Sequence, residues 1–211
     1  MEILNSCKLI FWDFDGVIKD SIEVKTQAFI DLFKTYGLDI AEKIRNHHES
    51  HGGMSRFDKI PLYLKWAGLE SNTCCVNDLC DKFSQLVIQG VINASFVSGA
   101  EFYLRKNCHK QIFILVSATP YHELKQILHA LNLFECFADI YGAPTQKKDA
   151  ISMALEAKRI DTKDCLMIGD SKEDYHAAKE NDVSFLLRRH STNSRVFLDY
   201  DGPFVNDFNA L

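Results

Sequence analysis

The spacing of the hydrophobic positions changes along this chain. Five short apolar runs lack strict alternation with polar residues, which is typical of strands buried on both faces of a parallel sheet. These runs cover residues 8–14, 111–117, 139–141, 165–168 and 183–187, the third being the least distinct. Helical periodicity occurs between them, over residues 121–131, 149–158 and 174–181. The alternation of strands and helices predicts an α/β fold with a Rossmann-like, doubly wound parallel sheet.

The segment between the first two strands shows only helical periodicity, from about residue 21 to residue 94. Asp20 and Glu23 predict a capping box at the start of its first helix, and further helices are expected over residues 40–49, 57–66 and 76–91. Ligands of doubly wound sheets bind beyond the carboxyl ends of the strands, so an insert joined there can close over a site. We therefore expect an α/β core of residues 1–16 and 95–211 and an inserted helical cap of residues 17–94.

The composition is that of a globular protein, with 46% hydrophobic and 25% charged residues. The formal net charge of −5 gives no reason to expect a nucleic-acid partner. The first apolar run is too short to span a membrane and is not flanked by the features of a secretion signal. The 7 cysteines include no C-x-x-C pair, which favours reduced thiols over zinc or a disulfide framework. We expect a cytoplasmic protein without a membrane partner; the oligomeric state is left open.

Two acidic residues end the first predicted strand. Asp13 and Asp15 alternate onto the same side of the chain, and Gly16 allows a sharp turn after them. Two carboxylates so close repel each other, and a cation beside them would relieve the repulsion. One acid can attack a substrate while its neighbour transfers protons to the leaving group and from water. The alternative interpretation is an aspartate that caps a turn or a helix.

A hydroxyl group and a lysine pair follow the next two strands. Ser117 and Ala118 end the second run just before a predicted helix, where a hydroxyl and free amides can bind an anion. Thr119 could equally be an ordinary helix cap. Lys147 or Lys148, after the third run, can neutralise a phosphate, although lysine pairs commonly lie in solvent.

Two further acids, Asp170 and Asp174, end the fourth strand. An acid there that faces Asp13 would be a hard oxygen ligand suited to Mg²⁺. Helix capping by Asp170 or Ser171 is the alternative.

Taken in order, these strand-end motifs resemble those of the haloacid-dehalogenase-like superfamily of phosphatases and phosphomutases, and the resemblance spans nearly the whole chain, cap included. The superfamily pattern is D-x-D-G-[VT], a strand-end Ser or Thr, a Lys, and G-D-x-x-x-D. The matching residues are Asp13, Asp15, Ser117, Lys147, Asp170 and Asp174.

The resemblance implies a role for each residue. Asp13 would attack phosphorus to form an aspartyl phosphate, and Asp15 would be the general acid and base. Ser117 and the amides near Ala118 would hold the phosphoryl oxygens, and Lys147 would bridge phosphate and nucleophile. Phosphoryl transfer depends mainly on positioning and on charge neutralisation, which these groups supply.

The resemblance also implies a Mg²⁺ cofactor. Its ligands would be the Asp13 carboxylate, the Asp15 backbone carbonyl and Asp170, with Asp174 ordering the groups around them.

The cap contains a further local resemblance. Residues 53–56 read Gly-Met-Ser-Arg and resemble the G-x-S-R specificity loop of sugar phosphomutases and related capped phosphatases. This implies that Gly53, Ser55 and Arg56 contact the substrate beyond the reacting phosphoryl group, and an arginine fork suits a phosphate, a carboxylate or sugar hydroxyls. The histidines at positions 47, 48 and 51 could form a metal site, but substrate contact or solvent exposure is the simpler interpretation.

Two residues narrow the reaction expected from the resemblance. Asp15 argues against dehalogenation and phosphonate cleavage, because members of the superfamily that catalyse these reactions lack an acid at this position. Gly169 stands where β-phosphoglucomutases carry an acid, which favours hydrolysis. We expect a Mg²⁺-dependent phosphatase for a small phosphorylated metabolite, such as a sugar or sugar-acid phosphate. A sugar phosphomutase and an inactive phosphate-binding regulator are the alternatives. A second D-x-D-G at residues 199–202 is interpreted as a turn, because too few residues follow it.

Overall fold

The computed structural model describes residues 2–209. The strands are β1 (Leu9–Trp12), β2 (Ile112–Pro120), β3 (Asp139–Ala143), β4 (Cys165–Gly169), β5 (Ser184–Arg188) and β6 (Phe204–Val205). The helices are α1 (Glu2–Ser6), α2 (Ile22–Phe33), α3 (Leu38–Ser50), α4 (Arg56–Trp66), α5 (Thr73–Asn93), α6 (Ala100–Asn107), α7 (Tyr121–Ala130), α8 (Lys147–Lys158) and α9 (Lys172–Glu180). Short 3₁₀ turns are η1 (Lys34–Tyr36), η2 (Phe134–Cys136) and η3 (Thr162–Asp164).

The strands form a single parallel sheet in the order β3-β2-β1-β4-β5-β6. The direction of the strand order reverses at β1, so a crevice is expected where the chain leaves β1 and β4. Trp12, the last residue of β1, lies opposite Leu115 of β2 and Ile168 of β4. The polar residues that follow these strands therefore emerge at the same edge. The predicted α/β class and doubly wound parallel sheet are confirmed.

Both faces of the sheet are covered, which explains the continuous apolar runs. Ile10 and Trp12 of β1 belong to one hydrophobic cluster, whereas Leu9 and Phe11 belong to a second cluster on the opposite face. The Trp12 ring also packs against Phe208, with ring centroids 5.4 Å apart. The segment after β5 thus returns to cover the first strand.

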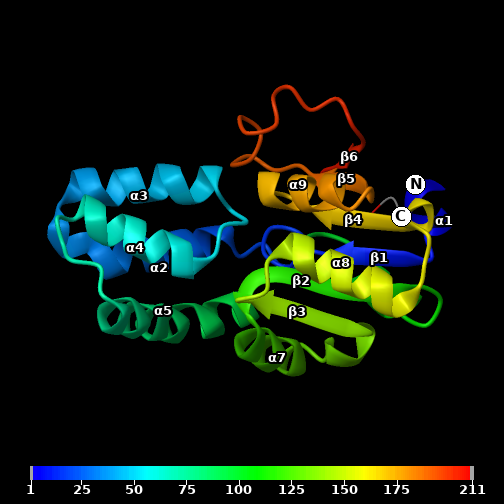
Figure 1. The fold of residues 1–211 in the computed structure, drawn as a ribbon, viewed down its shortest axis with the longest axis horizontal. Helices are drawn as coiled ribbons and strands as arrows, with labels where there is room; N and C mark the ends of the chain where they lie inside the picture. Colours follow the sequence, from blue (N-terminus) through cyan, green and yellow to red (C-terminus); the bar gives the residue numbers. More distant parts are fainter. Residues whose placement is uncertain (1, 210–211) are drawn as a thin grey trace.

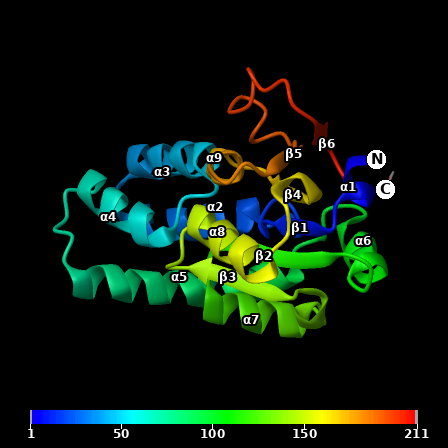
Figure 2. The same cartoon turned by 45° about the vertical axis from the view of Figure 1, so that its right-hand side comes forward.

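Helices α2, α3, α4 and α5 gather beside the carboxyl ends of the strands, whereas α1 and α6 lie at the opposite end of the molecule (Figures 1 and 2). Aromatic packing joins these four helices: the Phe29 ring lies 5.0 Å from His48 of α3, 5.4 Å from Tyr63 of α4 and 4.1 Å from Phe83 of α5, centroid to centroid. The helical insert therefore lies where the sequence predicts a cap, and its boundaries at residues 17 and 94 stay a prediction. Among the described residues, no helix is both long and apolar enough to cross a membrane.

Some local expectations are wrong. The capping box of Asp20 and Glu23 does not form, because α2 begins at Ile22 with Ser21 as its N-cap residue. The Ser21 hydroxyl makes no capping bond and donates instead to Asp15. The sequence reading also missed α1, α6 and β6, which are short elements without a clear periodicity.

Candidate active site

A cavity lies between the carboxyl edge of the sheet and the cap. From the core it is lined by Asp13, Asp15, Ser117, Ala118, Thr119, Lys147 and Asp170. From the cap it is lined by Ile22, Lys25, Phe29, His48, Gly52, Gly53, Met54, Arg56, Lys59 and Phe83. The structure therefore brings residues of all four strand-end motifs together beneath the helical insert.

Lys147, the first residue of α8, lies between two buried aspartates. Its Nζ is 2.9 Å from Asp13 Oδ1 and 2.5 Å from Asp174 Oδ1. Burial raises the pKa of Asp13 well above its usual range, and the charge of Asp174 adds to this effect, whereas Lys147 opposes it. Burial alone would lower the pKa of Lys147, but the charges of Asp13 and Asp174 outweigh it and raise that pKa. The lysine is thus a fixed cation beside the candidate nucleophile. The reserve candidate Lys148 is half-exposed and lies 3.7 Å from Glu180.

The Asp15 carboxylate is held by three donors. Ser21 donates to it at 2.6 Å and Thr119 at 3.1 Å, and Lys25 of α2 forms an ion pair with it. Burial alone would raise the pKa of Asp15, but the Lys25 ammonium and these hydrogen bonds lower it below its usual value. Asp15 is therefore a carboxylate in this arrangement, with a cap lysine as its counter-charge.

Ser117 and Thr119 shape the end of β2. The Ser117 hydroxyl is buried and accepts a hydrogen bond from the Thr119 amide at 3.1 Å. The Thr119 hydroxyl accepts from Lys25 at 2.7 Å while it donates to Asp15. Thr119 is not the N-cap of α7, since that position is Pro120. Its hydroxyl is part of the cavity instead.

Three buried carboxylates meet at the crevice between β1 and β4. One oxygen each of Asp13, Asp170 and Asp174 lies within 4.8 Å of the others. Burial raises the pKa of Asp170, and His190 opposes this by its hydrogen bond to Asp170 Oδ2, 2.9 Å from His190 Nε2. The backbone turns close to this group: Gly16 has φ +78°, and a Cβ there would overlap the Asp170 carboxylate. Only glycine fits this turn without a shift.

The donor set fits a hard divalent cation such as Mg²⁺. The oxygens are buried and repel one another, and a cation among them would relieve both penalties. Asp13 and Asp170 each use one oxygen in the contacts described, which leaves the other for a metal. Asp174 is engaged through both oxygens, because its Oδ2 accepts from the Ser171 amide and hydroxyl in a capping box of α9. Asp174 is therefore suited to ordering the groups around the metal ligands, as the sequence resemblance implies, and not to binding the metal itself. The expected ligand from Asp15, its carbonyl, precedes the turn at Gly16.

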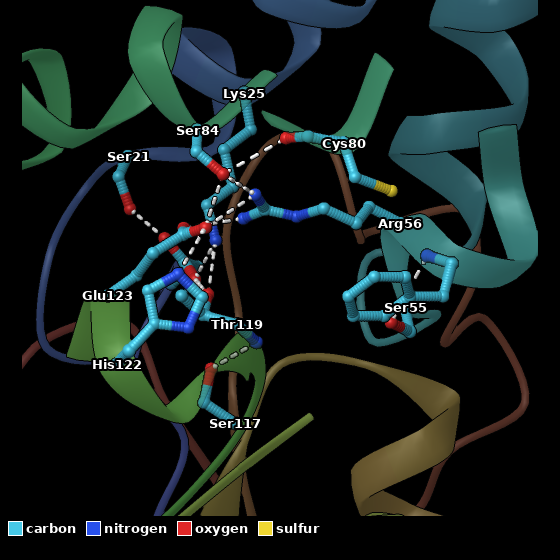
Figure 3. Close-up of polar contacts among 12 residues, drawn as sticks. Ser21, Lys25, Ser55, Arg56, Cys80, Ser84, Ser117, Thr119, His122 and Glu123 are labelled. Atoms are coloured by element: carbon cyan, nitrogen blue, oxygen red, sulfur yellow. Dashed lines mark hydrogen bonds and ion pairs between the residues drawn. The ribbon is translucent and has the colours of Figure 1, made fainter. Parts of the chain in front are cut away.

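Arg56 lines the cavity, but its guanidinium is bound by a carboxylate of the core. Figure 3 shows it reaching from α4 to Glu123 of α7, with Ser84 of α5 beside the pair. Nη1 donates to Glu123 Oε1 and Nη2 to Oε2, both at 2.7 Å, and Nη1 also donates to Ser84 at 2.8 Å. Both charged side chains are buried, Glu123 completely. Contact between Arg56 and a substrate stays a prediction.

The other cap residues expected at the substrate occupy the contact between cap and core. A Cβ at Gly53 would overlap Ser171 and Glu173, so the glycine lets the loop approach α9 closely. Ser55 is the N-cap of α4, and its hydroxyl accepts from the Phe57 amide at 3.4 Å. Ser55 lines a groove outside the cavity, together with Glu173, whereas Gly53 lines both the groove and the cavity. Their substrate contacts also stay predictions.

The three cap histidines do not share one environment. The His47 ring stacks on His51 at 4.3 Å, and its Nδ1 lies 3.0 Å from the Tyr63 hydroxyl. His48 is buried and faces Lys59. Within residues 2–209, the aspartates at the crevice form the only group of three or more potential metal-ligating side chains, so the histidines are not a metal site there.

The sequence matches the haloacid dehalogenase-like hydrolase profile over residues 10–187, which is more than half of the chain. The chain belongs to the haloacid dehalogenase-like hydrolase family. No curated protein sequence was found to match it.

Solved structures of other haloacid dehalogenase-like proteins share the fold. A β-phosphoglucomutase from Clostridium difficile matches with a TM-score of 0.79 at 18% identity, over 97% of this chain and 93% of that chain. CbbY from Rhodobacter sphaeroides, solved with xylulose-(1,5)bisphosphate, matches with a TM-score of 0.78 at 15% identity, over 96% of this chain and 95% of that chain. A predicted phosphoglycolate phosphatase from Haemophilus somnus matches with a TM-score of 0.75 at 17% identity, over 96% of this chain and 95% of that chain. At these identities the likeness shows the fold alone.

Several residues of this haloacid dehalogenase-like site were missed by sequence reasoning. His190 follows β5 as the other motifs follow their strands, so its position was a signal that could have been used. Lys25 and Lys59 sit on helices of the cap and Glu123 on α7, where nothing in the periodicity separates them from surface charges. Only the packing of cap on core brings them to the cavity.

Proposed function

We propose that this protein is a Mg²⁺-dependent phosphatase that hydrolyses the phosphate monoester of a small metabolite through an aspartyl phosphate on Asp13. The observation that carries the proposal is the ion pair of Asp13 with Lys147 at the carboxyl edge of the sheet, with Asp15 and Asp170 in the same cavity. Membership of a hydrolase family supports the reaction class. A sugar or sugar-acid phosphate is the substrate proposed.

In the first step, an Asp13 oxygen attacks phosphorus and the ester oxygen leaves. Lys147 offsets the charge that builds between a carboxylate and a phosphate, and Ser117 with the amides after it binds phosphoryl oxygens. A bound Mg²⁺ would add charge neutralisation at the phosphate and at Asp13. Asp15 gives a proton to the ester oxygen, so it must enter this step in its protonated form, which the ion pair with Lys25 disfavours.

In the second step, water attacks the aspartyl phosphate. Asp15 is then required as a carboxylate that accepts a proton from that water. The ion pair with Lys25 favours this form. The arrangement in which Lys25 pairs with Asp15 therefore suits the second step.

Phosphomutase activity is the second candidate, because a β-phosphoglucomutase is among the structural neighbours. Gly169 supports hydrolysis instead. A Cβ at this position would overlap the Asp174 side chain, so an acid here would displace the residue that holds Lys147. A cytoplasmic location belongs to the same proposal; its support is that all seven cysteines are free thiols.

The experiment is phosphate release from p-nitrophenyl phosphate and from a panel of sugar and sugar-acid phosphates, with Mg²⁺ and with chelator. We expect Mg²⁺-dependent release that Asp13→Asn abolishes, whereas Asp20→Asn, at an exposed position in the same linker, retains it. Isomerisation of a sugar phosphate with little free phosphate would favour the mutase. No turnover of any ester with Mg²⁺ would refute both.

A further inference from the structure

The cationic side chains that line the cavity are not equivalent. Lys25 pairs with Asp15, Arg56 with Glu123, and Lys147 with Asp13 and Asp174. Lys59 is the fourth cation, and no carboxylate among residues 2–209 lies within ion-pair distance of it. It is therefore the cation whose charge is not offset by the protein.

Lys59 is buried to the same degree as the hydrophobic core. The residue is 1% exposed, and its Nζ lies over the Phe29 ring, 5.7 Å from the ring centroid. Its partner is a neutral group: Nζ lies 2.8 Å from His48 Nδ1. Burial holds the pKa of His48 well below its usual value, and Lys59 lowers it further, so His48 is the acceptor and carries its proton on Nε2. Two of the three Lys59 donors remain without a partner within the described chain.

A buried cation without a counter-charge destabilises a fold, and such groups gather at functional sites. Burial lowers the pKa of Lys59 to about 7, with the charge of Glu173 opposing this effect from outside contact distance. An anion bound beside Nζ would supply the missing counter-charge. The reacting phosphoryl group is met by Asp13, Lys147 and Ser117 from the core, whereas Lys59 enters from the cap. The anion that fits is thus a second one on the same molecule.

We propose that Lys59, oriented by His48, binds a second anionic group of the substrate, a carboxylate or a further phosphate. It thereby selects phosphate esters that carry such a second group over esters that do not. This inference rests on the proposed phosphatase function and specifies its substrate class. Arg56, three residues earlier on the same helix face, is kept from this task by Glu123.

The test compares matched esters that differ in the second anion. Phosphoglycolate is paired with phosphorylated ethylene glycol, and fructose bisphosphate with fructose monophosphate, so the two arms separate a carboxylate from a phosphate. We expect the wild type to prefer one of the anionic members by about tenfold or more in kcat/KM, and Lys59→Met to remove most of that preference. Lys59→Arg should restore part of it. Lys65→Met, at an exposed position of the same helix, should leave the preference unchanged.

Three results would overturn the proposal. Equal kcat/KM for both members of each pair in the wild type would exclude a second-anion site. Equal losses on both members in Lys59→Met would place Lys59 at the reacting phosphoryl group. The same loss of preference in Glu173→Gln would show that Lys59 acts through its interaction with Glu173 of α9 and not by binding the substrate. Calorimetric binding of the same esters separates this proposal from the phosphatase function: Lys59-dependent binding without hydrolysis would refute the function and keep the site.

Discussion

The guanidinium of Arg56 and the carboxylate of Glu123 form a bidentate ion pair, with both N–O distances at 2.7 Å, that joins α4 of the cap to α7 of the core. The pair is buried, and Ser84 completes it by donating to Glu123 at 2.5 Å. Removal of one partner from such a pair leaves a buried charge without compensation, whereas removal of both does not.

We therefore expect Arg56→Met to lower the free energy of unfolding by about 3 kcal/mol. The double variant with Glu123→Gln should regain most of that loss, because no unpaired charge remains. Urea unfolding of the two single variants and the double variant measures the coupling. A loss below about 1 kcal/mol in Arg56→Met would show that the pair contributes little.

Asp13→Asn should abolish turnover and at the same time stabilise the metal-free protein. An amide is a poor nucleophile, so kcat should fall by a factor of about 10³ or more. The substitution also removes one of three buried carboxylates, and the charges of the other two, Asp174 and Asp170, raise the pKa of Asp13. Thermal unfolding in chelator, with Asp20→Asn as the control, measures the second effect. A destabilised Asp13→Asn would contradict the repulsion described for the cluster.

Mg²⁺ should raise the melting temperature of the wild type, because a ligand that binds only the folded state stabilises it by mass action. Asp170→Ala should abolish this shift together with turnover. Ca²⁺ should stabilise the protein without supporting turnover, since it favours more and longer oxygen contacts than Mg²⁺. Undiminished activity after chelation would refute the metal assignment.

Lys59→Met should make the protein more stable at pH 7 than the wild type. The pKa of Lys59 is about 7 in the fold and 10.5 at its usual value, so the cost of its charge is full below pH 7 and declines as the pH rises towards 10.5. The gain should be about 2 kcal/mol or more at pH 7 and should shrink towards pH 10. The groups nearby that could mask it are His48, Glu173 and Lys25. A gain that does not vary with pH would contradict this origin.

Gly53→Ala should impair closure of the cap, because a Cβ would overlap Ser171 and Glu173. Gly52→Ala is the matched control, since its nearest heavy atom would be 4.0 Å away, at ordinary contact distance. We expect faster hydrogen exchange in the loop at residues 51–55 for Gly53→Ala only, together with a lower kcat. Equal exchange in the two variants would show that the loop adapts.

The sequence was sufficient for five of the six strands and for most of the groups at the carboxyl edge of the sheet. Parallel strands present their ends at one edge, so Asp13, Ser117 and Asp170 could be placed together from strand positions, whereas the choice of Lys147 over Lys148 needed the superfamily pattern. The helices of the cap could be predicted from their periodicity, although the N-cap of α2 could not, because the Ser21 hydroxyl bonds Asp15, at the candidate active site, instead of its own helix.

The partners of the cap residues could not be predicted, because they depend on how two separately patterned parts of the chain pack. The G-x-S-R resemblance gave Arg56 a substrate role, but nothing in the sequence indicated that Glu123 would meet it. Lys59 did not stand out in the sequence, and His48 was expected to contact substrate or lie in solvent. Their pairing arises only when α3 and α4 lie side by side. The residues that follow the last predicted strand likewise gave no sign that Asn193 would bond the Asp170 carbonyl.

The contact of Trp12 with Phe208 has a consequence for the order in which the protein can mature during synthesis. The strand that ends at the candidate nucleophile is made among the first residues, yet one face of its last residue stays uncovered until residue 208 has left the ribosome. The same late segment supplies His190 and Asn193 to Asp170. A nascent chain that ends before this segment would have β1 to β5 and the cap without the partners of Asp170, the proposed metal ligand, so activity should appear only after nearly all of the chain has been made.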